Sequence, residues 1–214
     1  MKQDIVVFDV LGPIYQYAEV NGRLENCIPF AYEKIKELHP EEYERAKNDF
    51  AFAAEMEFRL FKEGAITCIA TPFAVDTLLY LKEKGIMPVV ASAGTDETLR
   101  FTLDTIVDNY NRQNGTKLVA NEVIPYKNLI STSPIGSKKD PKTWQTAVYD
   151  NFGANNRILL GYEDSINNCL ALANGLNCTG LHIVSENCNL SIVQYNPTII
   201  RGTMEQHYKM LRGG

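Results

Sequence analysis

The sequence predicts an α/β protein with a doubly wound, Rossmann-like parallel sheet and a small helical cap inserted after the first strand. From about residue 70 onward, short apolar runs without polar alternation take turns with stretches of helical spacing. Such runs are typical of strands buried on both faces of a parallel sheet. Residues 14–70 break this rhythm with charge-rich stretches of helical character. We therefore predict a core domain formed by residues 1–13 and 71–214 and a cap domain formed by residues 14–70.

The predicted core strands are short, rich in Val, Ile and Leu, and end in turns that contain Gly or Asp. They are residues 5–10, 87–92, 157–162 and 180–184, with 117–124 as a weaker candidate. The helices expected between them carry the usual terminal signals, such as an acidic first turn, Pro or Ser at the start and Gly at the end. They are residues 73–85, 96–110, 141–153 and 165–176. We assign no role to the tail from residue 186.

The insert at 14–70 has two interpretations. Its apolar positions, which include Phe30, Ile35, Leu38 and Leu60, could form the interior of a small helical bundle that folds as a separate cap. Alternatively, its helices are ordinary ones that pack on the sheet. The insert is long and lacks a strand of the core type, which favours the cap.

Composition limits the classes of partner. Hydrophobic residues make up 45% of the 214 residues and charged residues 22%, which is enough to bury a full core. The net charge of −5 is spread over the chain without a Lys/Arg block. We therefore expect no nucleic-acid or membrane partner. A small anionic substrate is compatible with this charge, because one lysine and a metal ion suffice for a local positive site.

The N-terminal segment MKQDIVVFDVLG is too short and too acidic for a signal peptide. No apolar stretch approaches the ~18 residues of a membrane span. The five cysteines show no CxxC spacing, and we expect free thiols in a reducing compartment. The three histidines, at 39, 182 and 207, are scattered without ligand spacing, so we expect surface or hydrogen-bonded residues. The expected location is the cytoplasm.

Polar side chains follow the predicted strands where a site is expected, since ligands of open α/β sheets bind at the carboxyl ends of the strands. Asp9 ends the first strand, Ser92 ends the second core strand, and Glu163 and Asp164 follow the third. The loop before that third strand contributes a lysine, Lys138 or Lys139.

This set makes chemical sense for phosphoryl transfer. A carboxylate can attack phosphorus and split a difficult hydrolysis into two easier steps. Crowded carboxylates favour a hard divalent cation such as Mg²⁺, which also neutralises phosphate oxygens. A lysine nearby keeps the nucleophile ionised and stabilises the transferring group.

Four segments, FDVLG (8–12), ASAG (91–94), GSKKDP (136–141) and GYEDSINN (161–168), resemble the ordered motifs of the haloacid-dehalogenase (HAD) superfamily. The resemblance covers about residues 1–13 and 70–184, and the insert lies where that family places its helical cap. One such motif alone is weak, but four in order are specific.

The resemblance implies a hydrolase with Asp9 as nucleophile and metal ligand, and with Mg²⁺ as cofactor. Ser92 becomes the phosphate-binding hydroxyl. Lys138 becomes the lysine of the third motif, preferred to Lys139 because of the Lys-x-Asp-Pro spacing. Asp164 becomes a metal ligand, Glu163 orients metal-bound water, and Leu11 offers its main-chain carbonyl to the metal.

The main departure from the family pattern is Leu11, which stands where phosphatases of this family carry a second, proton-transferring Asp. Pro13 and Ala93 are further departures. Loss of a general acid/base costs about 10²–10⁴-fold in rate. Dehalogenases and phosphonoacetaldehyde hydrolases of the family also lack the second Asp.

Three functions therefore stay open. They are a Mg²⁺-dependent phosphatase of small phosphorylated metabolites, a metal-independent dehalogenase or phosphonate hydrolase, and a catalytically impaired binding protein. The sequence indicates neither a particular substrate nor an oligomeric state.

Overall fold

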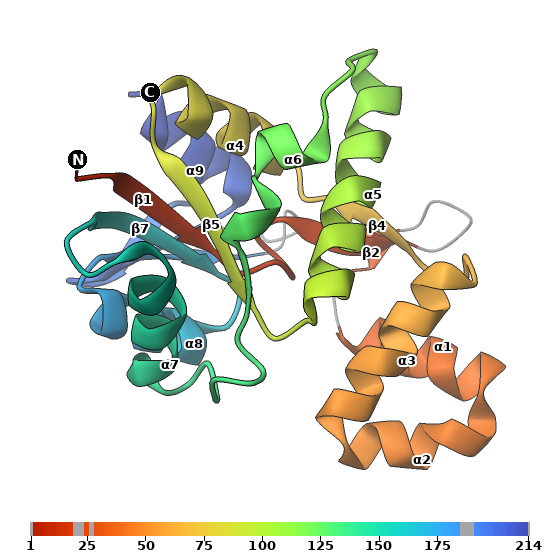
Figure 1. The fold of residues 1–214 in the computed structure, drawn as a ribbon. Coiled ribbons are helices and arrows are strands. Elements are labelled where there is room, and N and C mark those ends of the chain that lie inside the picture. Colours follow the sequence, from red (N-terminus) through yellow and green to blue (C-terminus); the bar gives the residue numbers. More distant parts are fainter. Residues whose placement is uncertain (1, 19–23, 26–27, 185–190, 214) are drawn as a thin grey trace. The chain divides into compact units, whose positions relative to one another are not determined.

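The computed structural model describes residues 2–18, 24–25, 28–184 and 191–213 (Figure 1). Three cysteines in this part, Cys68, Cys169 and Cys178, are free thiols, whereas Cys27 and Cys188 lie outside the described residues. None of the helices within the described ranges is both long enough and apolar enough to cross a membrane.

The chain divides into two compact units. The core unit comprises residues 1–15 and 70–214, and the inserted unit comprises residues 16–69. Each unit has its own sheet, with seven strands in the core unit and three associated with the inserted unit, counted over the described residues.

The core sheet confirms the predicted doubly wound parallel architecture. Its strand order is β6-β5-β1-β7-β8-β10-β9, and only β9 at one edge runs antiparallel to its neighbour. The strands are β1 (Asp4–Phe8), β5 (Met87–Ser92), β6 (Leu129–Ser131), β7 (Arg157–Glu163), β8 (Thr179–Ile183), β9 (Val193–Asn196) and β10 (Ile199–Gly202). Because β5, β1 and β7 are direct neighbours, their carboxyl ends lie at one edge of the sheet.

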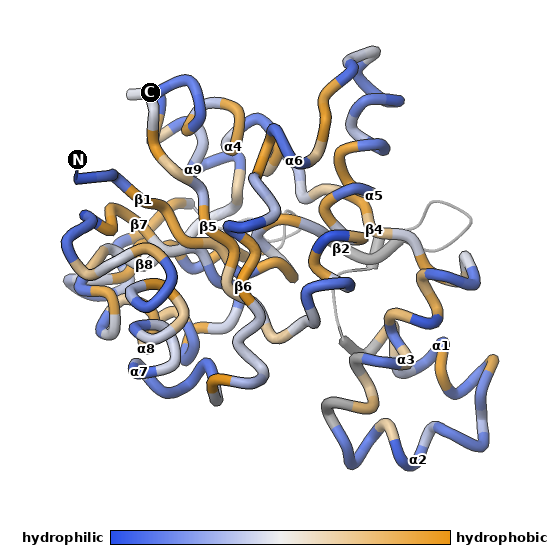
Figure 2. Tube along the Cα trace, in the orientation of Figure 1, coloured by the Kyte–Doolittle hydropathy of each residue, from blue (hydrophilic) through white to orange (hydrophobic). Residues whose placement is uncertain are grey.

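Apolar residues on both faces of the central strands explain why this sheet is buried. On one face, Ile5 and Val7 pack in a core cluster with the fully buried Trp144. On the other, the ring of Phe8 stacks on that of Tyr162 with 4.5 Å between centroids. Figure 2 shows the hydrophobic residues concentrated along β1 and β5. This two-sided burial is the reason for the continuous apolar runs in the sequence.

The core helices cover both faces of the sheet. One layer includes α7 (Pro141–Gln145), which continues into a π-helical turn η2 (Thr146–Asp150), and α8 (Ile166–Leu176). The remaining helical elements are α4 (Ala74–Glu83), α5 (Asp96–Asn114), α6 (Ala120–Val123), the 3-10 turn η1 (Tyr126–Asn128) and α9 (Met204–Leu211). Helix α5 begins with the Thr95 side chain accepting from the Thr98 N–H and ends at Gly115 in the left-handed conformation. Both ends thus use standard caps.

One predicted strand of the core is wrong. Residues 117–124 form no strand, because Ala120, Val123 and Ile124 are buried at helical spacing while Val119 is 53% exposed. The strand in this region is β6, only three residues long, which is too short to show a pattern. The tail, for which we predicted no role, adds β9 and β10 to the core sheet and ends in α9.

The inserted unit combines helices with a small sheet that the sequence did not predict. The helices are α1 (Ile28–Leu38), α2 (Pro40–Asn48) and α3 (Phe50–Lys62). The strands are β2 (Tyr15–Ala18), β3 (Leu24–Glu25) and β4 (Thr67–Ala70), in the order β3-β2-β4. Phe30, Ile35 and Leu60 are buried as expected of an interior, whereas Leu38, at the last position of α1, is 45% exposed.

We predict that Gly175→Ala destabilises the core unit by about 1–3 kcal/mol through overpacking. A Cβ at this position would lie 2.4 Å from the main-chain oxygen of Pro141, at the start of α7, and neither backbone can move easily. Urea unfolding would measure the loss. The control Asn174→Ala, at the exposed neighbouring position of α8, should change stability by less than about 0.5 kcal/mol. Equal stabilities for the two variants would contradict the close approach of α7 and α8.

Candidate active site

The residues predicted from the motifs lie at the carboxyl edge of three adjacent strands. Asp9 directly follows β1, and its N–H donates to the carbonyl of Tyr162 at 2.8 Å, so the pairing of β1 with β7 extends to the site. Glu163 is the last residue of β7, and Asp164 follows it. Ser92 is the last residue of β5. The strand order therefore brings together residues that are up to 155 positions apart in the chain.

Three carboxylates form a tight group. Asp9, Glu163 and Asp164 each offer one oxygen, and these oxygens lie within 4.8 Å of one another. Asp9 is 3% exposed and Glu163 is fully buried. Burial and the negative charge of Asp9 raise the pKa of Asp164 to about 6 and hold the pKa of Glu163 well above its usual value. The cluster is thus electrostatically strained when every carboxyl group is ionised.

Lys138 lies between two of these carboxylates. Its Nζ is 2.6 Å from Asp9 Oδ2 and 2.6 Å from Glu163 Oε1. Burial alone would lower the pKa of Lys138, but the two carboxylates outweigh it and raise the pKa above its usual value. The lysine therefore stays protonated and holds a charge-assisted bond to Asp9. The neighbouring Lys139 is exposed.

The main chain of Lys138 is held by a buried tryptophan. Trp144 Nε1 donates to the Lys138 carbonyl at 2.8 Å, and the Trp144 side chain is fully buried in the α7 layer. This bond between residues six positions apart anchors the lysine loop, and the tryptophan is a packing residue.

Glu163 has both carboxylate oxygens engaged. Oε1 accepts from Lys138 and, at 3.1 Å, from Asn168 Nδ2, while Oε2 accepts from the Ser165 N–H at 2.8 Å. These bonds give Glu163 the geometry of a residue that orients Lys138. Its predicted part in the metal site stays a prediction.

Asp9 and Asp164 fit a metal ion better. Asp9 Oδ1 is buried and has no hydrogen-bond partner among the described residues. A buried carboxylate oxygen without a donor is costly, and a cation is the partner that such an oxygen can take. A set of carboxylate oxygens suits a hard divalent cation such as Mg²⁺.

The loop after β1 approaches Asp164 very closely. Gly12 has φ of +86°, and a Cβ there would lie 2.5 Å from the Cβ of Asp164. The Thr71 hydroxyl donates to the Gly12 carbonyl and fixes this turn. Leu11, directly before it, is half-buried and offers no titratable side chain. The sequence signalled Gly12 only as part of the first motif, and nothing signalled Thr71.

Ser92 lies at the same edge of the sheet as the acidic cluster, because it is the last residue of β5. It is 9% exposed, and its carbonyl accepts from the Thr132 N–H at 2.8 Å. The structure thus brings Asp9, Lys138, Glu163 and Asp164 into direct proximity, with Ser92 and Leu11 positioned by the backbone next to them.

The histidines are more buried than the sequence indicated. His207 is fully buried, which contradicts a surface position, and burial lowers its pKa to about 4. His182 is 8% exposed, and its Nε2 lies 2.9 Å from the main-chain oxygen of Asp164. No local sequence pattern indicates this contact.

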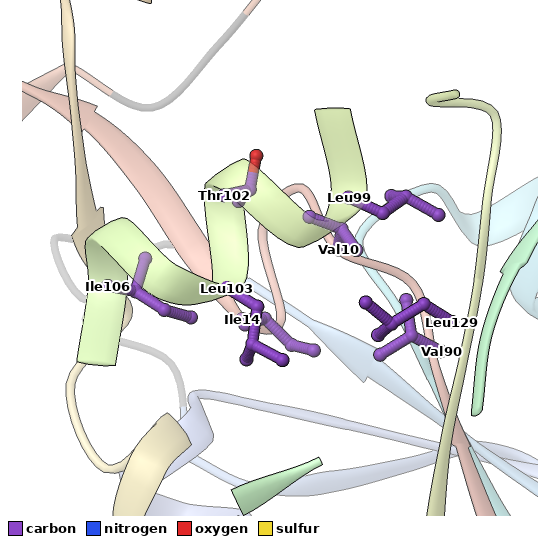
Figure 3. Close-up of a pocket in the computed structure, with 8 residues that line it drawn as sticks. All are labelled: Val10, Ile14, Val90, Leu99, Thr102, Leu103, Ile106 and Leu129. Carbon is purple, nitrogen blue, oxygen red and sulfur yellow. The ribbon is translucent and has the colours of Figure 1, made fainter. Parts of the chain in front are cut away.

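A small apolar pocket lies under α5 and is separate from the carboxylates (Figure 3). Thr102 is the one polar residue in its lining, which contains no titratable group. The lining residues are Val10, Ile14, Val90, Leu99, Thr102, Leu103, Ile106 and Leu129. The pocket thus lacks the chemistry that the acidic edge has.

Three features together indicate the class of fold. They are the parallel sheet, the acidic cluster with a lysine at its carboxyl edge, and the unit inserted in the chain after the first strand. The chain has the fold of the HAD superfamily, and the predicted resemblance is confirmed at the level of the fold.

Three solved structures illustrate the likeness. CbbY from Rhodobacter sphaeroides, in complex with phosphate, has a TM-score of 0.57 and 15% identity, with 93% of each chain covered. A HAD-superfamily hydrolase from Ehrlichia chaffeensis has a TM-score of 0.54 and 13% identity over 100% of this chain and 98% of its own. An L-2-haloacid dehalogenase has a TM-score of 0.53 and 14% identity over 99% of this chain and 100% of its own. No protein-family model and no curated protein matches the chain.

We predict that Asp164 makes the metal-free protein less stable as the pH rises. Its folded pKa of about 6 lies above the usual value near 4, so between these values the folded state binds more protons than the unfolded state. The contribution of Asp164 to stability therefore falls from about pH 4 to pH 6, by at most about 1.4 kcal/mol per pH unit.

Urea unfolding in EDTA at several pH values would measure this effect as the difference between wild type and Asp164→Asn. The variant should gain stability relative to wild type as the pH rises. Parallel curves would show that the pKa of Asp164 is not raised in the folded state.

Proposed function

We propose that the chain is a hydrolase, and specifically a Mg²⁺-dependent phosphatase of small phosphorylated metabolites that acts through an aspartyl-phosphate on Asp9. The observation that carries the proposal is the environment of Asp9. Its buried carboxylate has one oxygen on Lys138 and the other without a partner, next to Asp164. We further propose that the inserted unit is a substrate-selecting cap and that the protein acts in the cytoplasm.

Each residue has a distinct part in this mechanism. An oxygen of Asp9 attacks phosphorus, the bond to the leaving oxygen breaks, and water later hydrolyses the acyl phosphate to restore the carboxylate and release phosphate. Lys138 pairs with Asp9 and stabilises the charge on the transferring group. Ser92 donates its hydroxyl to a phosphate oxygen.

Asp9, Asp164 and the Leu11 carbonyl would hold Mg²⁺, with Glu163 orienting water in its shell. When bound, the ion would neutralise phosphate oxygens and relieve the repulsion between the carboxylates. CbbY, which shares the fold, was solved both with phosphate and, as a variant, with xylulose-(1,5)bisphosphate. These complexes support an anionic, phosphorylated substrate for this chain.

Leu11 limits which leaving groups the substrate can have. It cannot protonate a leaving group, and the absence of that help costs about 3–5 kcal/mol of barrier. We therefore expect substrates with a good leaving group, or an acid supplied by the inserted unit.

The same residue favours a second candidate, a metal-independent dehalogenase or phosphonate hydrolase, and the fold is shared with an L-2-haloacid dehalogenase. The acidic cluster argues for the phosphatase, because a metal-free reaction has no need of Asp164 beside Asp9. A catalytically impaired binding protein is the third candidate, and only an assay separates it from the other two.

We predict that wild-type protein releases phosphate from acetyl phosphate or p-nitrophenyl phosphate with Mg²⁺ and that Asp9→Asn abolishes the release, because the amide is no nucleophile. A phosphate-release assay with and without EDTA would measure both effects. The control Asp150→Asn changes an exposed carboxylate on η2 and should keep the activity.

The same panel should include 2-haloacids and phosphonoacetaldehyde. If the protein releases halide, or phosphate from the phosphonate, and a chelator does not affect the release, the second candidate would replace the phosphatase. No measurable activity with any of these substrates would favour a binding protein.

We predict that Leu11→Asp raises turnover of phosphate esters with poor leaving groups, by about 10²-fold where the new carboxyl supplies the missing proton. Leu11→Asn is the matched control, because it has the same shape and transfers no proton. The ratio of kcat for an alkyl phosphate to kcat for p-nitrophenyl phosphate should rise only in Leu11→Asp. An unchanged ratio would mean that an acid already acts from elsewhere.

A further inference from the structure

His182 contacts the main chain of Asp164, a residue of the acidic cluster. It is on β8, where it is the register partner of Glu163 on β7 and of Arg201 on β10, so the three side chains share one face of the sheet near its carboxyl edge. The ring is 8% exposed, and its Nε2 is 2.9 Å from the main-chain oxygen of Asp164.

The direction of this hydrogen bond follows from the chemistry. A carbonyl oxygen only accepts, so Nε2 carries the hydrogen and donates it. The other ring nitrogen, Nδ1, is buried and has no partner in the described part of the chain. No competing acceptor there draws the hydrogen to Nδ1, and a neutral ring protonated at Nε2 satisfies the geometry.

The Asp164 segment is fixed from three sides. His182 holds its carbonyl, Glu163 accepts from the N–H of the next residue, and the turn at Gly12 abuts its Cβ. The His182 bond is the only one of these that comes from a strand outside the β1–β7 pair. It therefore ties the direction of the Asp164 side chain to the neighbouring strand.

We propose that His182 is a positioning residue that sets the metal affinity of the site through the main chain of Asp164. The inference rests on the proposed function, since it takes Asp164 as a ligand of Mg²⁺. Residues that orient metal ligands typically change metal affinity by about 10–100-fold when they are lost.

The test uses two variants that separate the hydrogen bond from the packing. His182→Phe keeps a ring of similar size and removes the N–H donor, whereas His182→Gln removes the ring and keeps an N–H at a similar reach. We expect a Kd for Mg²⁺ at least about 10-fold weaker for His182→Phe, and close to that of wild type for His182→Gln. Isothermal titration calorimetry on the full-length protein measures the Kd without any substrate. His39→Phe is the control, because its buried ring bonds Glu63 in the inserted unit.

A second readout is hydrogen exchange of the amides at 164–166, which should become faster in His182→Phe and stay slow in His182→Gln. The opposite order in both measurements, with Gln impaired and Phe like wild type, would show a packing role and overturn the proposal. Unchanged Kd values in both variants would overturn it as well.

Failure of the proposed function gives a different result. In that case the wild-type protein itself would bind no Mg²⁺ and release no phosphate. A wild type that binds Mg²⁺ while His182→Phe binds it equally well would overturn only the role of His182.

Discussion

The ion pairs of Lys138 with Asp9 and Glu163 are the interaction on which the site depends. One oxygen each of Asp9, Glu163 and Asp164 lie within 4.8 Å of one another in a largely buried position. Without Lys138, Asp9 and Glu163 would lose the ion pairs that the described residues give them. One lysine balances only one of up to three negative charges, and burial together with the charge of Asp9 raises the pKa of Asp164. A buried ion pair adds little net stability, but removal of one partner leaves a buried charge uncompensated. Lys138 thus offsets part of this negative charge, and a bound cation would offset the rest.

Backbone constraints deliver these charged groups to one place. The order β5-β1-β7 aligns the ends of three strands, and the positive φ of Gly12 lets the first loop lie against Asp164. Trp144 anchors the lysine loop from within the core. The positions of the charges are therefore set by packing, so that a cation or substrate would meet a preorganised group rather than assemble one.

The sequence predicted the parts of the fold whose signal is local. The strands at Asp9 and Glu163 are continuous apolar runs because both faces of the sheet are covered, and the acidic residues directly follow them. Strand β6 has only three residues, and β10 is recognisable only through its pairing with β8, so neither has a periodic pattern to detect. The contacts of His182 and Thr71 with the site are tertiary, and an isolated His or Thr gives no local sign of its partner. The segment 117–124 is wrongly predicted as a strand, because a short apolar run such as this one fits both periods.

The site separates two tasks that phosphatases usually combine. Lys138 can stabilise negative charge, and the carboxylates with the unpartnered oxygen of Asp9 could hold a cation that adds to this effect, whereas Leu11 can transfer no proton. A reaction that needs only the first task has a leaving group that departs as a stable anion. Acyl phosphates, aryl phosphates and carbon–halogen compounds share this property, although they belong to different candidate functions. This common requirement follows from Leu11 where no other group of the protein supplies the acid. The choice among these substrates depends on whether the carboxylates hold a cation, which would favour a phosphoryl group over a halide.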